Sequence, residues 1–176
     1  MTAKIGQVLL TEEQIKKRVK ELAHEISRDY YGRVPVLVSV LKGGILFLSD
    51  LMRELTVDHE IDFMSVSSYD GGVESSGIVR IIADLSINVE GKDVIIVEDI
   101  VDTGLTLDYI RHILLARHPK SLRICALLDK RARRKIDVPI DYVGFVVPDE
   151  FVIGYGLDYQ EKYRNLPYIA ILELEE

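Results

Sequence analysis

The most strongly patterned stretch of the chain is the β-branched run from Val94 to Val97. A short run that is apolar at every position predicts a strand buried on both faces of a parallel sheet. The run stops at Glu98 and Asp99, and a turn of small residues then leads into a helical spacing of apolar residues that opens at Leu105. This stretch therefore predicts a strand, an acidic edge, a turn and a helix, in that order.

Similar patterns predict elements along the rest of the chain. Thr11 and Gln14 have the spacing of a capping box, and apolar residues then recur on one helical face as far as Tyr30. Further helices are expected over residues 45–55 and from Leu105 onward. Strands are expected over residues 34–41, 61–69, 78–85, 122–128, 141–147 and 168–174, with a short strand or ribbon inside residues 151–159. Strands that alternate with helices predict an α/β fold with a twisted, mainly parallel sheet flanked by helices.

Composition narrows the class of protein. The 176 residues are 48% hydrophobic, which suits one α/β domain with a sizeable core, and we place no domain boundary between residues 1 and 176. No apolar run is long enough to cross a bilayer, and Met1 to Leu10 lacks the cationic start and apolar core of a secretory signal. The single cysteine, Cys125, is expected to be a buried, inert thiol. We expect a cytoplasmic protein without a membrane partner.

The net charge of −7 argues against a nucleic-acid partner, because binding to a phosphate backbone needs a basic face. It leaves room for a small basic pocket that binds an anionic metabolite. A charge run follows residue 130, and we predict that its four basic members are solvated: Arg131, Arg133, Arg134 and Lys135. Lys130 differs from them, since it ends a strand on the same rim of the sheet as Glu98.

The turn after the acidic edge has the composition of an anion site. Asp102, Thr103, Gly104 and Thr106 would present backbone N–H groups and hydroxyls at the start of a helix, where phosphate groups bind. Carboxylates beside them suit a vicinal diol or a divalent metal. A ligand with a phosphate at one end and a sugar diol in the middle meets both demands. The alternative is an ordinary strand-to-helix corner in which Asp102 or Thr103 is merely the helix N-cap.

Residues 98–106, which read EDIVDTGLT, resemble the signature of the type I phosphoribosyltransferases, which bind phosphoribosyl pyrophosphate (PRPP). The resemblance extends over nearly the whole chain, from about Val8 to Leu174. It implies the type I phosphoribosyltransferase fold in a single domain, with a small cap, or hood, over the C-terminal edge of the sheet. The N-terminal segment and residues 148–167 would form this hood.

Other segments resemble the hypoxanthine-guanine group of this family. Leu41-Lys42-Gly43 resembles its short pyrophosphate loop, in which the peptide between the first two positions can be cis. Lys130, and the segment from Phe151 to Arg164, resemble the residues that hold the purine and a metal. The resemblance implies purine salvage, in which the 5-phosphoribosyl group of PRPP is transferred to hypoxanthine or guanine to give IMP or GMP and pyrophosphate.

The resemblance also implies a role for each matching residue. Asp102 would be the catalytic residue, as general acid/base for a ring nitrogen of the purine. The substrate-binding residues would be Lys42, Gly43 and Arg164 for pyrophosphate, Glu98 and Asp99 for the ribose hydroxyls, Asp102, Thr103, Gly104, Leu105 and Thr106 for the 5-phosphate, and Lys130, Phe151 and Val152 for the purine. Magnesium would be held by Glu98, Asp99 and Asp158, and Ser68 and Tyr69 would begin a lid that closes over the site.

The choice of purine has a physical reason at Lys130. An ammonium group only donates hydrogen bonds, so it suits a ring carbonyl and rejects a ring amine. This favours hypoxanthine and guanine over adenine. Phe151 would stack on the purine ring, and the backbone of Val152 would accept a hydrogen bond from the exocyclic amine of guanine.

Three matters stay open from the sequence. Residues 70–77 lack periodicity and form either the mobile lid or a plain hairpin extension. A nucleotide-sensing, RNA-binding regulator of the same fold is the alternative function, which the negative net charge disfavours. Similar enzymes are oligomers, and we expect a homodimer or a homotetramer.

Overall fold

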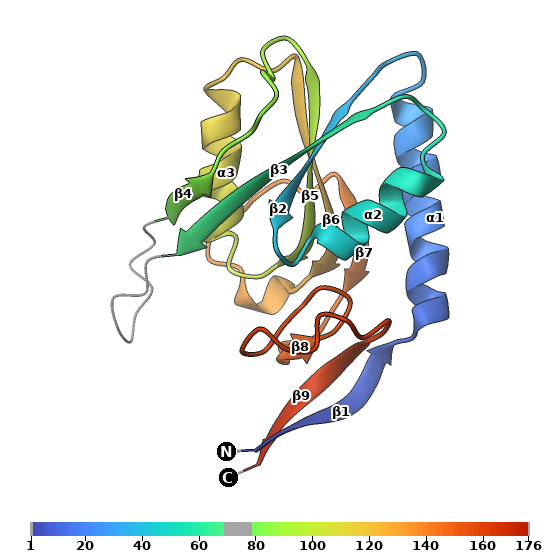
Figure 1. Cartoon of the computed structure of the whole chain (residues 1–176), viewed down its shortest axis with the longest axis vertical. Helices are drawn as coiled ribbons and strands as arrows, with labels where there is room; N and C mark the ends of the chain where they lie inside the picture. Colours follow the sequence, from blue (N-terminus) through green and yellow to red (C-terminus); the bar gives the residue numbers. More distant parts are fainter. Residues whose placement is uncertain (1, 69–78, 176) are drawn as a thin grey trace.

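The computed structural model describes residues 2–68 and 79–175 and contains a six-stranded sheet in the order β4-β3-β2-β5-β6-β7. The strands are β2 (Val36–Leu41), β3 (Glu60–Ser68), β4 (Val79–Ala83), β5 (Asp93–Val101), β6 (Ser121–Asp129) and β7 (Tyr142–Val146). All neighbours run parallel except β4, which pairs antiparallel with β3. The predicted α/β fold with a mainly parallel sheet is confirmed (Figure 1).

Helices cover both faces of this sheet (Figure 1). They are α1 (Glu12–Asp29), α2 (Ile45–Glu54) and α3 (Leu105–Leu115). On β5, Ile95 and Val97 belong to the core beneath α1 and α2, whereas Val94 and Ile96 belong to the core beneath α3. All four side chains are fully buried. This confirms the two-sided burial that their unbroken β-branched run predicts.

The two ends of the chain meet in a second, smaller sheet (Figure 1). Its strands are β1 (Thr2–Leu10), β8 (Val152–Ile153) and β9 (Ile169–Glu175), in the order β1-β9-β8. The sequence pattern indicates β8 and β9 but no strand at residues 2–10, because two irregularities in the pairing of β1 with β9, around Val8, break the alternation that identifies a strand. The single domain with a hood stays a prediction.

One boundary differs from the predicted one in a way that affects the site. The sequence predicts that the strand of residues 94–97 ends before Glu98, but pairing with β6 continues β5 to Val101. Glu98 and Asp99 therefore lie within the last residues of a strand, and Glu98 pairs with Ala126 in the ladder. Tyr69 and residues 70–77, where a lid is expected, lie outside the described residues.

The structure also describes the surroundings of the single cysteine and the character of the helices. Cys125 is buried in β6 as expected, and burial raises the pKa of its thiol far above the ordinary value. In the part of the chain that the structure describes, no helix has the length and apolar character needed to cross a membrane.

Candidate active site

A cleft lies at the C-terminal ends of β2, β5 and β6, beneath the segment that contains β8. Two adjoining cavities of about 220 and 410 Å³ form it. Among the predicted site residues, Glu98, Asp102, Thr103, Gly104 and Thr106 line the smaller cavity. Gly43, Glu98, Asp99, Asp102, Lys130, Phe151, Val152, Asp158 and Arg164 line the larger one. Because Glu98 and Asp102 line both, the cavities form one continuous cleft.

The turn from Asp102 to Thr106 leads from β5 into α3 without a side-chain cap. Its N-cap is Gly104, with φ of 85°, so neither alternative N-cap residue holds that position. The hydroxyl of Thr103 accepts only a long hydrogen bond of 3.4 Å from the N–H of Leu105. A Cβ at Gly104 would lie 2.7 Å from the carbonyl oxygen of Ile136, and glycine avoids both this clash and the left-handed strain. The N–H groups at the start of α3 therefore stay available to an anion.

The acidic end of β5 is a buried pair of carboxyl groups. Glu98 is only 8% exposed, and burial together with the neighbouring Asp99 charge raises its pKa well above the ordinary range. Burial also raises the pKa of Asp99 to about 6, although backbone N–H groups and the Arg164 charge oppose that rise. The pair therefore keeps a proton more readily than isolated carboxyls do, and a cation or a hydroxyl donor would relieve this strain.

Asp102 points one carboxylate oxygen, Oδ1, into a buried position where the described residues supply no hydrogen bond. The nearest cation is Arg133, whose Nε lies 3.5 Å from that oxygen. The Arg133 side chain is 53% exposed, which confirms its predicted solvated position, but it also lines the larger cavity, which the sequence did not indicate. Its position three residues after the strand edge at Lys130 is the signal that could have indicated it.

The other three members of the charge run differ in how exposed their side chains are. Arg131 and Lys135 are exposed, as predicted. For Arg134 the predicted solvated position is wrong, because its side chain is only 17% exposed and is paired with Asp129. A short 3₁₀ turn, η1 (Arg131–Arg133), leads directly into Arg134, and the chain direction after this turn sets Arg134 against Asp129.

The loop after β2 brings backbone close to the acidic pair. The Leu41–Lys42 peptide is cis, and a side chain at Gly43 would overlap the Asp99 carboxylate. Glycine is therefore required for this close approach. The Lys42 side chain points elsewhere: it is exposed and its ammonium lies 2.9 Å from a carboxylate oxygen of Glu161. Neither Lys42 nor Leu105 lines either cavity of the cleft.

Lys130, which follows the last residue of β6, and Phe151, which precedes β8, both line the larger cavity. Lys130 is only 5% exposed, and no hydrogen bond or ion pair of its ammonium group is found among the described residues. Phe151 is 52% exposed and packs edge to face against Tyr159, with ring centroids 5.8 Å apart. Val152 is buried beside it in β8. An uncompensated donor and an exposed ring face thus share one cavity.

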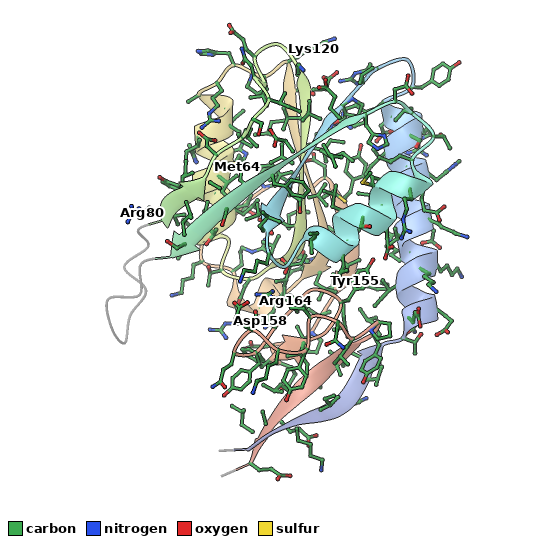
Figure 2. All side chains as sticks on the ribbon, in the orientation of Figure 1. Met64, Arg80, Lys120, Tyr155, Asp158 and Arg164 are labelled. Carbon is green, nitrogen blue, oxygen red and sulfur yellow. The ribbon has the colours of Figure 1, made fainter. Side chains whose placement is uncertain are left out.

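Asp158 and Arg164 lie together at the hood side of the cleft (Figure 2). Arg164 donates from Nη1 to the carbonyl of Gly156 over 2.7 Å, and its Nη2 lies 3.3 Å from the Asp158 carboxylate. Its Nε is buried, and the described residues give it no hydrogen-bond partner. Of the remaining predicted residues, Ser68 is the last residue of β3, and Tyr69 lies outside the described residues.

Comparisons with known proteins agree with this geometry. Residues 7–160 match the family model described as "Phosphoribosyl transferase domain". The hypoxanthine-guanine phosphoribosyltransferase of Bacillus subtilis is 51% identical over 169 residues, which cover 96% of this chain and 94% of that protein. The hypoxanthine phosphoribosyltransferase of Escherichia coli K12 is 49% identical over 173 residues, which cover 97% of each chain.

Solved structures give the same result. A crystal structure of a hypoxanthine-guanine phosphoribosyltransferase from Bacillus anthracis superposes with a TM-score of 0.92 at 46% identity, covering 98% of this chain and 100% of that chain. A hypoxanthine phosphoribosyltransferase from Staphylococcus aureus superposes with a TM-score of 0.93 at 53% identity, covering 96% and 92%. Some relatives are longer: the chain is 51% identical to the bifunctional protein TilS/HprT of Listeria innocua but spans 26% of its length.

The fold, the cleft and these matches define the class of protein: the chain belongs to the phosphoribosyltransferase family, and within it to the hypoxanthine-guanine phosphoribosyltransferases. The resemblance inferred from the sequence and the type I fold are thereby confirmed. The alternative function as an RNA-binding regulator has no support among these relatives, whose names are those of transferases.

Proposed function

We propose that the chain transfers the 5-phosphoribosyl group of PRPP to hypoxanthine or guanine, giving IMP or GMP and pyrophosphate. The observation that carries the proposal is that one cleft contains the acidic strand end, the phosphate-type turn, and the pair Lys130 and Phe151. The Bacillus subtilis relative, whose name states this activity, is 51% identical across nearly the whole chain.

PRPP lies along the cleft. The turn from Asp102 to Thr106 binds the 5-phosphate through backbone N–H groups and hydroxyls at the start of α3. Glu98 and Asp99 bind the ribose hydroxyls, which donate hydrogen bonds to carboxylates. The backbone of Lys42 and Gly43, together with Arg164, faces the pyrophosphate, where negative charge grows as the bond to the anomeric carbon breaks.

The purine enters against Phe151, and its ring carbonyl accepts a hydrogen bond from Lys130. The carbonyl oxygen of Val152 accepts a hydrogen bond from the exocyclic amine of guanine. Asp102 takes up the proton that the imidazole ring of the purine loses while the new bond to the ribose forms. The Nε of Arg133 lies 3.5 Å from Oδ1 of Asp102, so a cation stands beside the carboxylate that takes up this proton.

The donor set fits magnesium only together with substrate oxygens. Within residues 2–68 and 79–175 there is no group of three His, Cys, Asp or Glu side chains able to hold an ion. Magnesium in proteins is commonly bound by one or two carboxylates plus substrate phosphates and water. Glu98 and Asp99 would hold such an ion, and Asp158 a second one after separating from Arg164. When bound, magnesium neutralises charge on the pyrophosphate leaving group.

The direct test is consumption of PRPP with hypoxanthine, guanine or adenine in the presence and absence of magnesium. We expect magnesium-dependent formation of IMP and GMP and little AMP. Acceptance of adenine, orotate or uracil alone would overturn the proposal. A gel-shift series with RNA across salt concentrations is the control for the regulator alternative, and no specific shift is expected.

The role of Asp102 has its own prediction. Asp102→Asn should keep PRPP binding and lose most of the turnover, about 100-fold or more, because an amide does not accept the proton. Binding is measured as the shift in thermal unfolding that PRPP and magnesium produce, and turnover by IMP formation. Turnover equal to the unmodified protein would remove the acid/base role.

Cytoplasmic location and the homodimer or homotetramer stay predictions from the sequence. The lid that would begin at Ser68 and Tyr69 also stays a prediction from the sequence.

A further inference from the structure

Arg134 joins two segments of the cleft from behind. Its Nη2 donates to the carboxylate of Asp129 at the end of β6, and its Nε donates to the backbone carbonyl of Asp102 over 3.1 Å. The Asp129 side chain is 4% exposed and that of Arg134 is 17% exposed, so little water competes for these bonds. The arginine therefore bridges the end of β6, next to Lys130, and the turn that contains Asp102.

The residues after Arg134 continue this support. The backbone N–H groups of Lys135 and Ile136 both donate to the carbonyl of Thr103, over 2.8 and 3.2 Å. A Cβ at Gly104 would lie only 3.1 Å from Cδ of Arg134, which shows how closely the turn rests on this side chain. The carbonyls of two successive turn residues are thus held on the side away from the cleft.

Peptide geometry gives this arrangement a consequence. In a planar trans peptide the carbonyl of one residue and the N–H of the next point in opposite directions. Bonds that hold the carbonyls of Asp102 and Thr103 from behind therefore turn the N–H groups of Thr103 and Gly104 towards the smaller cavity, which both residues line. These are the N–H groups that an anion at the start of α3 would use.

We propose that Arg134 is a positioning residue for the transfer reaction: it fixes the peptide planes of the 102–106 turn and, with them, the carboxylate of Asp102. Arg134 itself lines neither cavity of the cleft, so it acts through the turn and not on the substrate. The inference rests on the proposed function for the identity of the ligand, a sugar phosphate, and for the role of Asp102.

Arg131, three residues before Arg134, supplies a matched control. Arg131 donates from Nε to the other oxygen of the same Asp129 carboxylate, over 2.9 Å, but its side chain is 65% exposed and makes no bond to the 102–106 turn among the described residues. Replacing either arginine by lysine keeps a positive charge beside Asp129. Only at Arg134 does the change remove a planar fork that donates in two directions at once.

The experiment compares Arg134→Lys with Arg131→Lys in the full chain. For Arg134→Lys we expect KM for PRPP to rise about 10-fold and kcat to fall about 10-fold, with KM for hypoxanthine changed less than about twofold, which corresponds to the loss of one aligned hydrogen bond to each dependent group. Arg131→Lys should leave all three constants within about twofold. Equal losses in both variants, or unchanged constants in Arg134→Lys, would overturn the inference.

A second variant and a second readout keep the test decisive. Asp129→Asn weakens the anchor of Arg134 without touching the arginine and should shift the same two constants in the same directions, by a smaller factor. Stabilisation of the protein against thermal unfolding by PRPP and magnesium should fall in Arg134→Lys and persist in Arg131→Lys. If the unmodified protein bound PRPP but transferred it to no purine, the proposed function would fail while this PRPP comparison would still decide the role of Arg134.

Discussion

In the proposed reaction, one largely buried side chain, Lys130, would select the purine. The Lys130 side chain is largely buried, and its ammonium has no hydrogen bond or ion pair among the described residues, so a ligand carbonyl would give this donor a partner. A substrate that brings an amine to the same place leaves the donor unpaired and adds a second donor. Discrimination against such a substrate therefore follows from one misplaced hydrogen-bonding group.

We predict that Lys130→Met raises KM for hypoxanthine about 10- to 100-fold, the loss expected for one charged hydrogen bond, and leaves PRPP affinity unchanged. The thermal stability of the free protein should change little, because methionine keeps the length and most of the apolar contacts of the buried lysine stem. Lys120→Met is the control, since Lys120 lies at the top of the molecule in the view of Figure 2, well apart from Asp158 and Arg164. An equal loss of PRPP affinity in Lys130→Met would place this side chain in another role.

Glu98 gives a prediction about pH. A carboxyl whose pKa is raised on folding binds its proton more tightly in the folded protein, so the free energy of unfolding falls as pH rises above the ordinary value of 4.5. Without PRPP and magnesium, Glu98→Gln should therefore unfold at a higher temperature than the unmodified protein at pH 8. The difference between the two proteins should shrink as the pH is lowered towards 5. At that pH the pair in the folded protein holds its protons more fully, since the pKa of Glu98 is raised and that of Asp99 is about 6.

Glu90→Gln, at an exposed position in a surface turn, serves as the control for Glu98→Gln and should change stability little at either pH. Thermal unfolding followed by circular dichroism measures both variants. A Glu98→Gln variant that is less stable than the unmodified protein at pH 8 would contradict the strained acidic pair.

At the scale of elements, the turn between β5 and α3 depends on one backbone conformation. Gly104 combines a left-handed φ of 85° with close contact to the segment behind it. Gly91 has a similar φ of 71°, but nothing lies within 4 Å of where its side chain would be. The two glycines therefore separate the cost of the dihedral angle from the cost of displacing the turn.

We predict that Gly104→Ala and Gly91→Ala each lose about 1 kcal/mol of stability from the left-handed backbone, and that Gly104→Ala loses more because its Cβ also meets a carbonyl. Only Gly104→Ala should raise KM for PRPP, with a smaller effect on KM for hypoxanthine. Steady-state kinetics and urea unfolding measure the two effects. A KM for PRPP that rises equally in both variants would show that global destabilisation is the cause.

At the scale of the whole molecule, a charged hydrogen-bond network lies at the N-terminal ends of β5 and β6, the ends away from the cleft. Arg33 donates from Nε and Nη2 to the two oxygens of Asp93, over 3.0 and 2.6 Å, and the hydroxyl of Ser121 donates to the same carboxylate. The guanidinium also lies over the ring of Tyr30, 4.7 Å from its centroid. This network ties the loop after α1 to the first residues of β5 and β6.

We predict that Asp93→Asn lowers stability at pH 7 by about 2 kcal/mol, the usual range for a charged hydrogen bond. The Arg33 hydrogen bond holds the pKa of Asp93 below its ordinary value of 3.8, so its contribution is present above that pH and is lost as pH falls through the folded-state value. The difference between the variant and the unmodified protein should therefore disappear in strong acid. Asp58→Asn, at an exposed loop position, should show no such pH-dependent difference.

Features that depend on neighbouring residues in the chain could be predicted from the sequence. The capping box at Thr11 and Gln14 forms as expected, with hydrogen bonds of 2.8 and 3.2 Å. The β-branched run of β5 is buried on both faces, and the turn that follows it opens α3. Local spacing determines these features, because capping, periodic burial and turn geometry involve residues only a few positions apart.

Features that depend on pairing between distant segments were decided by the tertiary structure. β1 exists because it pairs with β9 at the other end of the chain, and β5 extends through Glu98 because β6 continues beside it. Arg133 and Arg134 belong to the cleft and to its support because a 3₁₀ turn sets them against residues about 30 positions earlier. The sequence by itself thus determined the chemistry available and the order of the elements. Only the tertiary structure decided which charged side chains are buried and which residues they pair with, because burial and long-range contact are properties of the folded core.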